Sequence, residues 1–196
     1  MNQVNIQLHK TEIVEVILGS FRGKLCLLDF VKGKARGTVE DGIRQVLDAE
    51  LVEQDDEILR ETRRQFDEYL EGQRKEFDIP VLMVGTDFQK NVWNAVMKVP
   101  YGATSTYSQM ARDIGKERAV RAVGNAMAAN PIVIIIPCHR IVGSDRMLVG
   151  YGGGLSLKKR LLTLERRNVS TLGALNTGAQ YVGAGHLSNR KGHPCY

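Results

Sequence analysis

The stretch "NPIVIIIPCHRIVGSD", residues 130–145, places a thiol, an imidazole and a guanidinium directly after a run of aliphatic residues. A thiol reacts as its thiolate, and a neighbouring imidazole can accept the proton. A carboxylate behind the imidazole would fix its tautomer and stabilise the cation. Cys138 and His139 supply the first two groups, and Glu165 is the candidate for the third. This set predicts nucleophilic chemistry at Cys138.

Direct contact between Cys138 and His139 is awkward, because adjacent side chains on an extended chain point apart. A bridging water or a sharp turn is needed, and Pro137 favours a turn. A Cys-His pair by itself has an alternative interpretation, in which the cysteine is a small buried hydrophobe and the histidine a satisfied structural group. If the His139 pairing holds, the pKa of Cys138 is expected to be depressed.

Glu165 stands out by its position on the predicted final helix, "SLKKRLLTLERR", which starts at Ser156. Leu157, Leu161 and Leu164 form its apolar face, and Glu165 falls on the same face. A carboxylate there is costly unless a partner holds it. The alternative is a glutamate near the helix end that reaches water.

Other elements must position these groups. Residues 12–31 read as two apolar strands around "GSFRG", a β-hairpin. Residues 41–75 carry spaced apolar positions typical of amphipathic helices, and 77–85 predict a short strand or extended linker. The aliphatic run 132–136 predicts a buried strand. A change of composition near residue 85 predicts a domain boundary.

The segment after the boundary predicts three helices. Thr86 with Gln89 and Thr106 with Gln109 form capping-box patterns, and Gly115 ends the second helix. The third helix spans about 117–129. Two short helices around a Gly-containing turn suggest a helix-turn-helix. Many helical hairpins share this pattern.

The third predicted helix has small side chains, which let a backbone approach another surface closely. One of its faces carries Arg118, Arg121, Ala122 and Asn125, and the other Val120, Val123, Gly124 and Met127. The alternative is a helix packed inside the protein with solvated arginines.

Composition bounds the class of protein. A chain of 196 residues suits one large domain or two small ones. No secretory signal and no membrane-spanning apolar run is evident in the sequence. Three cysteines without a CxxC pair fit a reducing compartment and argue against a disulfide framework or a four-ligand zinc site.

Charge is unevenly distributed along the chain. Residues 1–85 hold 12 basic and 17 acidic residues, whereas residues 86–170 hold 13 basic and 5 acidic residues. This asymmetry suggests that the second half faces a polyanion, although a solvated basic surface would look the same. Residues 170–196 are rich in Gly and predict a poorly ordered extension. Its His186, His193 and Cys195 are too scattered to predict a metal site.

The Cys-His pair lies in a wider pattern. "IPCHRIV", preceded by "RAVGNAMAANP" and followed by "GYGGGLSLKKRLLTLE", resembles the O6-alkylguanine-DNA alkyltransferases. The resemblance is close over residues 86–168, looser over the N-terminal half and absent from the tail. It implies an α+β protein: a ribonuclease H-like domain of a small sheet with helices (1–85), and a helical, helix-turn-helix domain for DNA binding and alkyl transfer (86–169).

The resemblance also implies roles for individual residues. Cys138 would accept the alkyl group, His139 would be its water-mediated base, and Glu165 would orient His139. Tyr107 would contact the 3′ phosphate, bind the flipped guanine and donate a proton to it. Ala122 and Asn125 would lie on the helix that contacts DNA, and Arg121 would take the place of the extruded base. Asn130 would brace the turn before Cys138, and Met127 would form an apolar wall of the base pocket. The backbone carbonyls of Cys138 and Ile141 would accept from the guanine amino group, and the loop with Tyr151 and Gly152 would close over the base.

The implied reaction is a single irreversible transfer of the alkyl group from O6-alkylguanine, and also from O4-alkylthymine, in double-stranded DNA bound through its minor groove. The resemblance also implies that the protein is a monomer and needs no cofactor. It implies a location in the cytoplasm, or in the nucleus if the organism is a eukaryote. Gly152 departs from the serine of many relatives, and only His9 and Cys26 in the N-terminal half could ligate zinc, so no metal is predicted. No sensor domain precedes the repair unit, which disfavours a transcription-activator role. The rival functions are a DNA-binding regulator or damage sensor and a Cys-His hydrolase.

Overall fold

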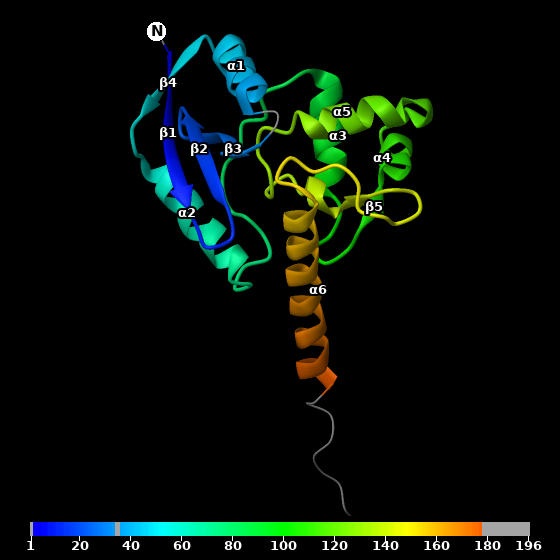
Figure 1. Cartoon of the computed structure of the whole chain (residues 1–196). Coiled ribbons are helices and arrows are strands. Elements are labelled where there is room, and N and C mark those ends of the chain that lie inside the picture. The colour runs from blue at the N-terminus through cyan, green and yellow to red at the C-terminus, as the bar shows by residue number, and fades with distance from the viewer. Residues whose placement is uncertain (1, 34–35, 178–196) are drawn as a thin grey trace, which may run out of the picture.

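The computed structural model describes residues 2–33 and 36–177. The chain forms a sheet domain followed by a helical domain, with a long C-terminal helix projecting from them (Figure 1). The mixed α+β architecture predicted from the sequence is therefore confirmed. Among the described residues, no helix combines the length and apolarity needed to cross a membrane.

The N-terminal sheet has four strands in the order β3-β2-β1-β4. These are β1 (Asn2–Lys10), β2 (Glu15–Phe21), β3 (Lys24–Phe30) and β4 (Ala49–Glu53). The predicted hairpin is β2–β3, and Arg22 and Gly23 at its turn both have positive φ, which matches the twist of a two-residue hairpin loop. β1 pairs antiparallel with β2 and parallel with β4.

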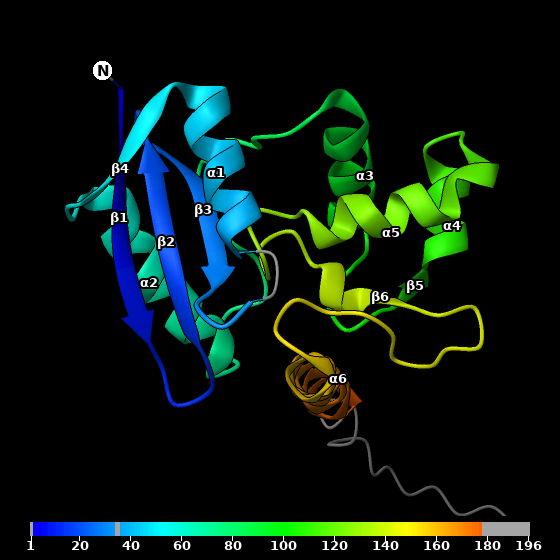
Figure 2. The ribbon, with the colours of Figure 1, turned by 45° about the horizontal axis from the view of Figure 1, so that its top comes forward.

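Two helices cover opposite faces of this sheet (Figure 2). Helix α1 (Arg36–Leu47) packs against the face that carries Ile17 and Leu27. Helix α2 (Glu57–Leu70) packs against the face that carries Val16 and Leu18, and the side chain of Asp56 caps its N-terminus. Successive strand residues alternate between the two faces, so each helix meets its own apolar set.

Two strands were not predicted. β4 lies inside residues 41–75, which were expected to be helical, and β1 precedes the predicted hairpin. β4 buries only Ala49 and keeps charged residues at a sheet edge, so its composition resembles the flanking helices. Pairing with β1 across the sheet, a non-local contact, decides its conformation.

The segment between α2 and α3 is extended, and the predicted domain boundary at residue 85 lies in it. Leu25 donates to the carbonyl of Pro80, and Leu82 donates to the carbonyl of Leu25, each over 2.8 Å. The segment predicted as a short strand or linker is therefore an extended connection that pairs locally with the edge of β3.

The second domain contains the three predicted helices. They are α3 (Asp87–Met97), α4 (Tyr107–Asp113) and α5 (Val120–Ala128), the last preceded by a 3-10 turn, η1 (Glu117–Ala119). The capping box of Thr86 and Gln89 is complete. At Thr106 only half of it forms, because the Gln109 side chain bonds Asp113 and Arg112 instead. A turn with Gly115 at φ 66° joins α4 to α5, so the predicted helical hairpin is present.

The predicted strand at residues 132–136 is wrong. The segment is a buried turn in which Ile134 adopts φ 72°, an unusual conformation for a β-branched residue. Isolated bridges join Leu28 to Ile132 and Val133 to Ile136. An apolar run shows burial but not conformation, and here the turn directs the chain from the edge of β3 towards Cys138.

A 3-10 turn, η2 (Cys138–Arg140), and a two-residue strand, β6 (Ile141–Val142), follow this turn. β6 pairs in parallel with β5 (Ser105–Thr106). The final helix, α6 (Leu155–Thr177), starts beside the predicted Ser156. It continues through 170–177, the first part of the segment that was predicted to be a poorly ordered extension. The rest of the predicted extension, with His186, His193 and Cys195, lies outside the described residues.

Candidate active site around Cys138

Cys138 begins η2 directly after the buried turn, and only 8% of its surface is exposed. The Nδ2 atom of Asn130 lies 3.3 Å from Sγ of Cys138 and donates to the carbonyl of Ile136 over 3.0 Å. The Oδ1 atom of Asn130 accepts from the amide of Ile132 over 2.9 Å. One buried amide thus joins both sides of the turn and reaches the thiol.

Burial raises the pKa of the Cys138 thiol to about 12, although the hydrogen bond from Asn130 and the charge of Lys158 act in the opposite direction. The expectation of a depressed pKa is therefore wrong for the free protein. Loss of water around the thiolate outweighs these two favourable contacts, and among the described residues no hydrogen bond joins Cys138 to His139. The resting thiol is protonated.

His139 and Glu165 form a buried pair. Their Nε2 and Oε1 atoms lie 2.8 Å apart, and both side chains are fully excluded from solvent. The carboxylate also accepts from Arg140 through Nη2 over 2.9 Å, from the amide of Gly102 over 2.9 Å and from the hydroxyl of Tyr69 over 2.6 Å. The predicted orienting role of Glu165 has a geometric basis, and the alternative in which it reaches water is excluded.

The electrostatics of the pair define its protonation. Burial disfavours the charged form of Glu165, but the hydrogen bonds and charges of His139 and Arg140 prevail and lower its pKa to about 2. Burial lowers the pKa of His139, and the contact with Glu165 offsets this only in part. With an ionised Glu165, Nε2 of the neutral imidazole carries the hydrogen and donates to the carboxylate. Nδ1 has no hydrogen-bond partner among the described residues, so its lone pair can accept a proton.

Lys158 on α6 is a buried cation that was not predicted. Its Nζ lies 2.5 Å from the carbonyl oxygen of Ile141, 2.7 Å from that of Val149 and 3.3 Å from that of Gly150. Burial lowers its pKa to about 8. Through these hydrogen bonds, Lys158 connects β6 with the far end of the loop that follows β6.

Sequence reasoning missed three residues of the site, and each had a signal. Lys158 precedes Glu165 by seven residues, which is the same face of α6. Tyr69 follows the buried Phe66 by three residues on α2, and a buried tyrosine hydroxyl requires a partner. Arg140 stands in the quoted motif, and its guanidinium binds Glu165 and the carbonyl of Val99.

Tyr107 begins α4 and is half-buried near the loop. Its ring lies 3.9 Å from the position that a Cβ on Gly124 would take. Its hydroxyl lies 3.9 Å from the position that a Cβ on Gly150 would take. Burial raises its pKa, and the charge of the Cys138 thiolate adds to the shift, so the phenol keeps its proton. A Cβ at either glycine would make only an ordinary contact with Tyr107.

The loop residues Tyr151 and Gly152 lie between the two domains. The Tyr151 ring packs edge-on against Phe30 at 5.5 Å and lies 6.3 Å from the His139 ring. Its buried hydroxyl has no partner among the described residues. Gly152 is exposed, and a Cβ there would meet Phe30 at an ordinary 3.7 Å, so the absent serine side chain is not excluded by space.

The structure places the remaining predicted substrate contacts nearby. Met127 is buried in the main core cluster that also contains Cys138. The carbonyl of Cys138 accepts from the amide of Ile141, and the carbonyl of Ile141 accepts from Lys158. A carbonyl oxygen can accept two hydrogen bonds, so neither of these contacts by itself excludes a second donor.

Helix α5 has one exposed and one buried face. Arg121, Ala122 and Asn125 are exposed, whereas Val123 and Met127 are buried. The predicted division of the helix is confirmed, and a helix packed inside on all sides is excluded. In the part of the chain that the structure describes, Arg121 has no salt-bridge partner.

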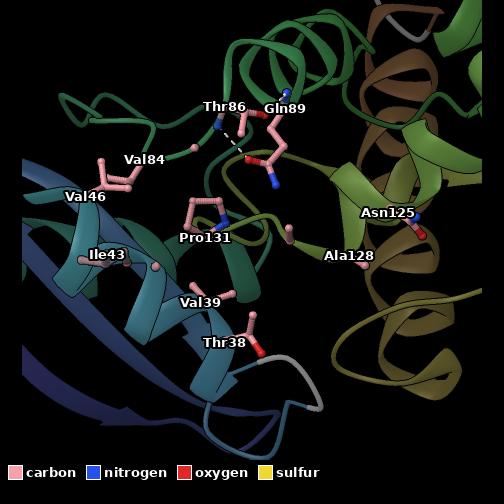
Figure 3. Close-up of a pocket in the computed structure, with 13 residues that line it drawn as sticks. Thr38, Val39, Ile43, Val46, Val84, Thr86, Gln89, Asn125, Ala128 and Pro131 are labelled. Carbon is pink, nitrogen blue, oxygen red and sulfur yellow. Dashed lines mark hydrogen bonds between the residues drawn. The ribbon is translucent and has the colours of Figure 1, made fainter.

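A groove of about 490 Å³ lies between α1 and the helices α3 and α5 (Figure 3). Val39, Ile43 and Val46 line one side, and Ala128 and Asn125 line the other. None of Cys138, His139 and Glu165 lines it. The groove therefore flanks the exposed face of α5 but is separate from the thiol site.

Comparison with known families matches both domains. Residues 16–83 match "6-O-methylguanine DNA methyltransferase, ribonuclease-like domain", and residues 87–167 match "6-O-methylguanine DNA methyltransferase, DNA binding domain". A methylated-DNA–protein-cysteine methyltransferase of Methanosarcina barkeri is 44% identical over 160 residues, which cover 82% of this chain and 96% of that protein. An inducible enzyme of that name from Bacillus subtilis is 48% identical over 122 residues, covering 62% of this chain and 68% of the relative.

A similar fold occurs in a solved structure. The crystal structure of Mycobacterium tuberculosis OGT in complex with DNA superposes with a TM-score of 0.72 and 33% sequence identity. The alignment covers 84% of this chain and 94% of that one. The similarity thus extends over both domains.

Proposed function

The chain belongs to the 6-O-methylguanine DNA methyltransferase family, and we propose that it repairs DNA by moving the alkyl group of O6-alkylguanine onto Sγ of Cys138. O4-alkylthymine is a second substrate of the same site. The observation that carries the proposal is the buried Cys138 thiol, bonded to Asn130 and followed by the His139–Glu165 pair. These groups can hold a thiol, remove its proton and stabilise the resulting cation.

The proposed reaction begins with the thiol proton. It passes through a bridging water to Nδ1 of His139, because no direct bond joins the two side chains, and Glu165 stabilises the imidazolium. The Cys138 thiolate attacks the alkyl carbon in line, and an S–C bond forms as the C–O bond breaks. The electron pair of that bond goes to the guanine oxygen. The phenol of Tyr107 donates a proton to guanine, and guanine leaves.

The product is a thioether at Cys138, which has no easy reverse reaction. The protein therefore acts once. It uses no cofactor, because the damaged DNA supplies the alkyl group, and it acts as a monomer in this proposal, because one copy of the chain holds all the residues assigned to the reaction. Tyr151, Gly152, Met127 and the two carbonyls form the base pocket.

DNA would bind on the exposed face of α5. Reaction at a base requires its extrusion from the duplex, which costs a few kcal/mol. Arg121 is exposed and has no acidic partner among the residues that the structure describes, so it can enter the stack in place of the base. Ala122 and Asn125 give a narrow surface that suits the minor groove, as architectural DNA-binding proteins use. Basic residues around this face make binding salt-sensitive and independent of sequence.

The two rival functions fit less well. A damage sensor does not require a thiol that is held by Asn130 next to the buried His139–Glu165 pair. A Cys-His hydrolase leaves the exposed arginine face of α5 without a role.

Intact-mass spectrometry tests the proposal. The protein is mixed with a duplex that contains one O6-methylguanine, with Cys138→Ala as the matched variant. The expected result is a stoichiometric gain of one methyl group at Cys138 that is absent from the variant. Tight binding to the damaged duplex with no mass gain would point to a sensor, and the proposal would be wrong.

A further inference from the structure

Tyr69 reaches the His139–Glu165 pair from the other domain. It lies near the C-terminal end of α2, and this end of α2 lies beside the middle of α6 (Figures 1 and 2). Its side chain is fully buried, and its hydroxyl donates to Oε1 of Glu165 over 2.6 Å. The same hydroxyl lies 3.3 Å from Nε2 of His139. One carboxylate oxygen therefore serves both the imidazole and the phenol.

The other groups around the pair come from the second domain. Glu165 also binds Arg140 and the amide of Gly102, and Lys158 adds a positive charge near His139. The Tyr151 ring faces the imidazole, and the Cys138 thiol precedes it. Among the described hydrogen-bond partners of Glu165, Tyr69 alone belongs to the sheet domain.

The Tyr69 hydroxyl is held in place and keeps its proton. Its ring packs against Phe77 at 5.2 Å and edge-on against Tyr101 at 6.0 Å. Burial raises the pKa of Tyr69 far above its ordinary value, and the charge of Glu165 adds to this shift. The phenol is therefore a fixed donor to the carboxylate at any pH at which the protein works.

We propose that Tyr69 is a positioning residue that sets the basicity of His139 through their shared oxygen of Glu165. This inference rests on the proposed function, because it assigns the sheet domain a part in alkyl transfer. A hydrogen bond from Tyr69 draws negative charge from Oε1, so the carboxylate stabilises the imidazolium less strongly. His139 thus stays neutral, and able to accept the thiol proton, to a lower pH than it would beside an unshared carboxylate.

The matched pair of variants is Tyr69→Phe and Tyr101→Phe. Both variants remove one hydroxyl from the same aromatic cluster. The Tyr101 hydroxyl, however, accepts a hydrogen bond from Asn168 and makes none with His139 or Glu165. Two quantities are measured for each protein. The first is the pH dependence of single-turnover alkyl transfer, and the second is the titration of the His139 imidazole by nitrogen-15 NMR in the free protein.

Tyr69→Phe is expected to raise the pKa of His139. Transfer requires the neutral imidazole, so the acid limb of the rate profile moves to higher pH, with a several-fold lower rate on that limb and no loss at the plateau, where the imidazole is neutral in both proteins. Tyr101→Phe is expected to leave both curves in place. An unchanged His139 titration in Tyr69→Phe, or an equal shift in Tyr101→Phe, would overturn the inference.

A second variant covers the case in which Tyr69→Phe unfolds. Site-specific 3-fluorotyrosine at position 69 keeps the ring and makes the phenol a stronger donor, so the His139 titration is expected to move to lower pH. A shift in the opposite direction, or none, would contradict the inference. The NMR titration needs no DNA. Failure of the unmodified protein to transfer methyl would therefore reject the proposed function separately from the role of Tyr69.

Discussion

The ammonium group of Lys158 lies 2.5 Å from the carbonyl oxygen of Ile141, so a buried cation on α6 holds the chain just after the reactive cysteine. The same Nζ binds the carbonyls of Val149 and Gly150 at the far end of the loop. The loop between Ile141 and Gly150, which Tyr151 directly follows, is therefore closed at its base by a single side chain. This contact makes α6 a support for the loop as well as the source of Glu165.

Replacement of Lys158 by methionine is expected to loosen this loop. A buried carbonyl without a donor costs about 1–3 kcal/mol, and of the three carbonyls only that of Ile141 belongs to a buried residue, so Lys158→Met should lower the free energy of unfolding by roughly 2 kcal/mol. Amides of residues 149–154 should exchange with solvent faster. The control is Lys159→Met, an exposed neighbour on the same helix, which should stay within about 0.5 kcal/mol of the unchanged protein. Equal behaviour of the two variants in urea unfolding and hydrogen exchange would contradict the assignment.

The resting thiol is expected to be unreactive at neutral pH. Because burial raises the pKa of Cys138 to about 12, its alkylation by iodoacetamide should be slow at pH 7 and should increase up to about pH 12. Asn130→Ala removes the hydrogen bond that lowers this pKa and should slow alkylation further at each pH. Peptide mapping assigns the modified cysteine. Fast alkylation of Cys138 that levels off below pH 8 would show a depressed pKa instead.

Glu165 is expected to contribute to acid sensitivity. Its folded-state pKa of about 2 is lower than that of an unfolded glutamate, so its contribution to stability is complete above pH 5 and is lost as the pH falls towards 2. Glu165→Gln should cost about 3–5 kcal/mol at pH 7, because the Arg140 charge loses its buried partner. Urea unfolding at pH 7 and pH 3 measures both effects. The difference in stability between the two proteins should narrow at pH 3, and a constant difference would exclude this role.

Arg121 is expected to act in base extrusion. Arg121→Ala should slow alkyl transfer from a fully stacked duplex by about tenfold, equivalent to roughly 1.4 kcal/mol, and by less when the lesion sits in a mismatch that already weakens stacking. Arg118→Ala, which removes another exposed cation near the start of α5, should weaken binding on both duplexes alike. Single-turnover rates on the two duplexes distinguish these effects. An equal loss on both duplexes in Arg121→Ala would assign it to phosphate contact alone.

Gly152 is expected to accept a serine. A Cβ there meets Phe30 only at an ordinary contact distance, and the side chain points to an exposed position. Gly152→Ser should therefore change the free energy of unfolding by less than about 0.5 kcal/mol. A matched contrast is Gly153→Ser, because a Cβ at Gly153 would come within 2.6 Å of the end of the Leu157 side chain and, on the other side, within 3.0 Å of the Phe30 ring, which cannot move as easily. Equal thermal stability of the two variants would refute the packing argument.

Local patterns in the sequence were sufficient for the elements whose conformation depends on neighbours in the chain. The β2–β3 hairpin, the capping box of Thr86 and the two faces of α5 follow from alternation, capping and helical spacing. The odd position of Glu165 on an apolar face indicated a buried partner, and His139 is that partner. Such signals are readable because each depends on residues only a few positions apart.

Contacts between distant segments decided the rest, and only the tertiary structure reveals them. β4 is a strand because β1 pairs with it, and the apolar run before Cys138 is a turn because Asn130 and β3 bind its backbone. Burial reverses the expected shift of the Cys138 pKa, since the cost of desolvation depends on everything packed around the thiol. Tyr69 joins the site across 96 residues of sequence, a distance at which spacing carries no information about contact.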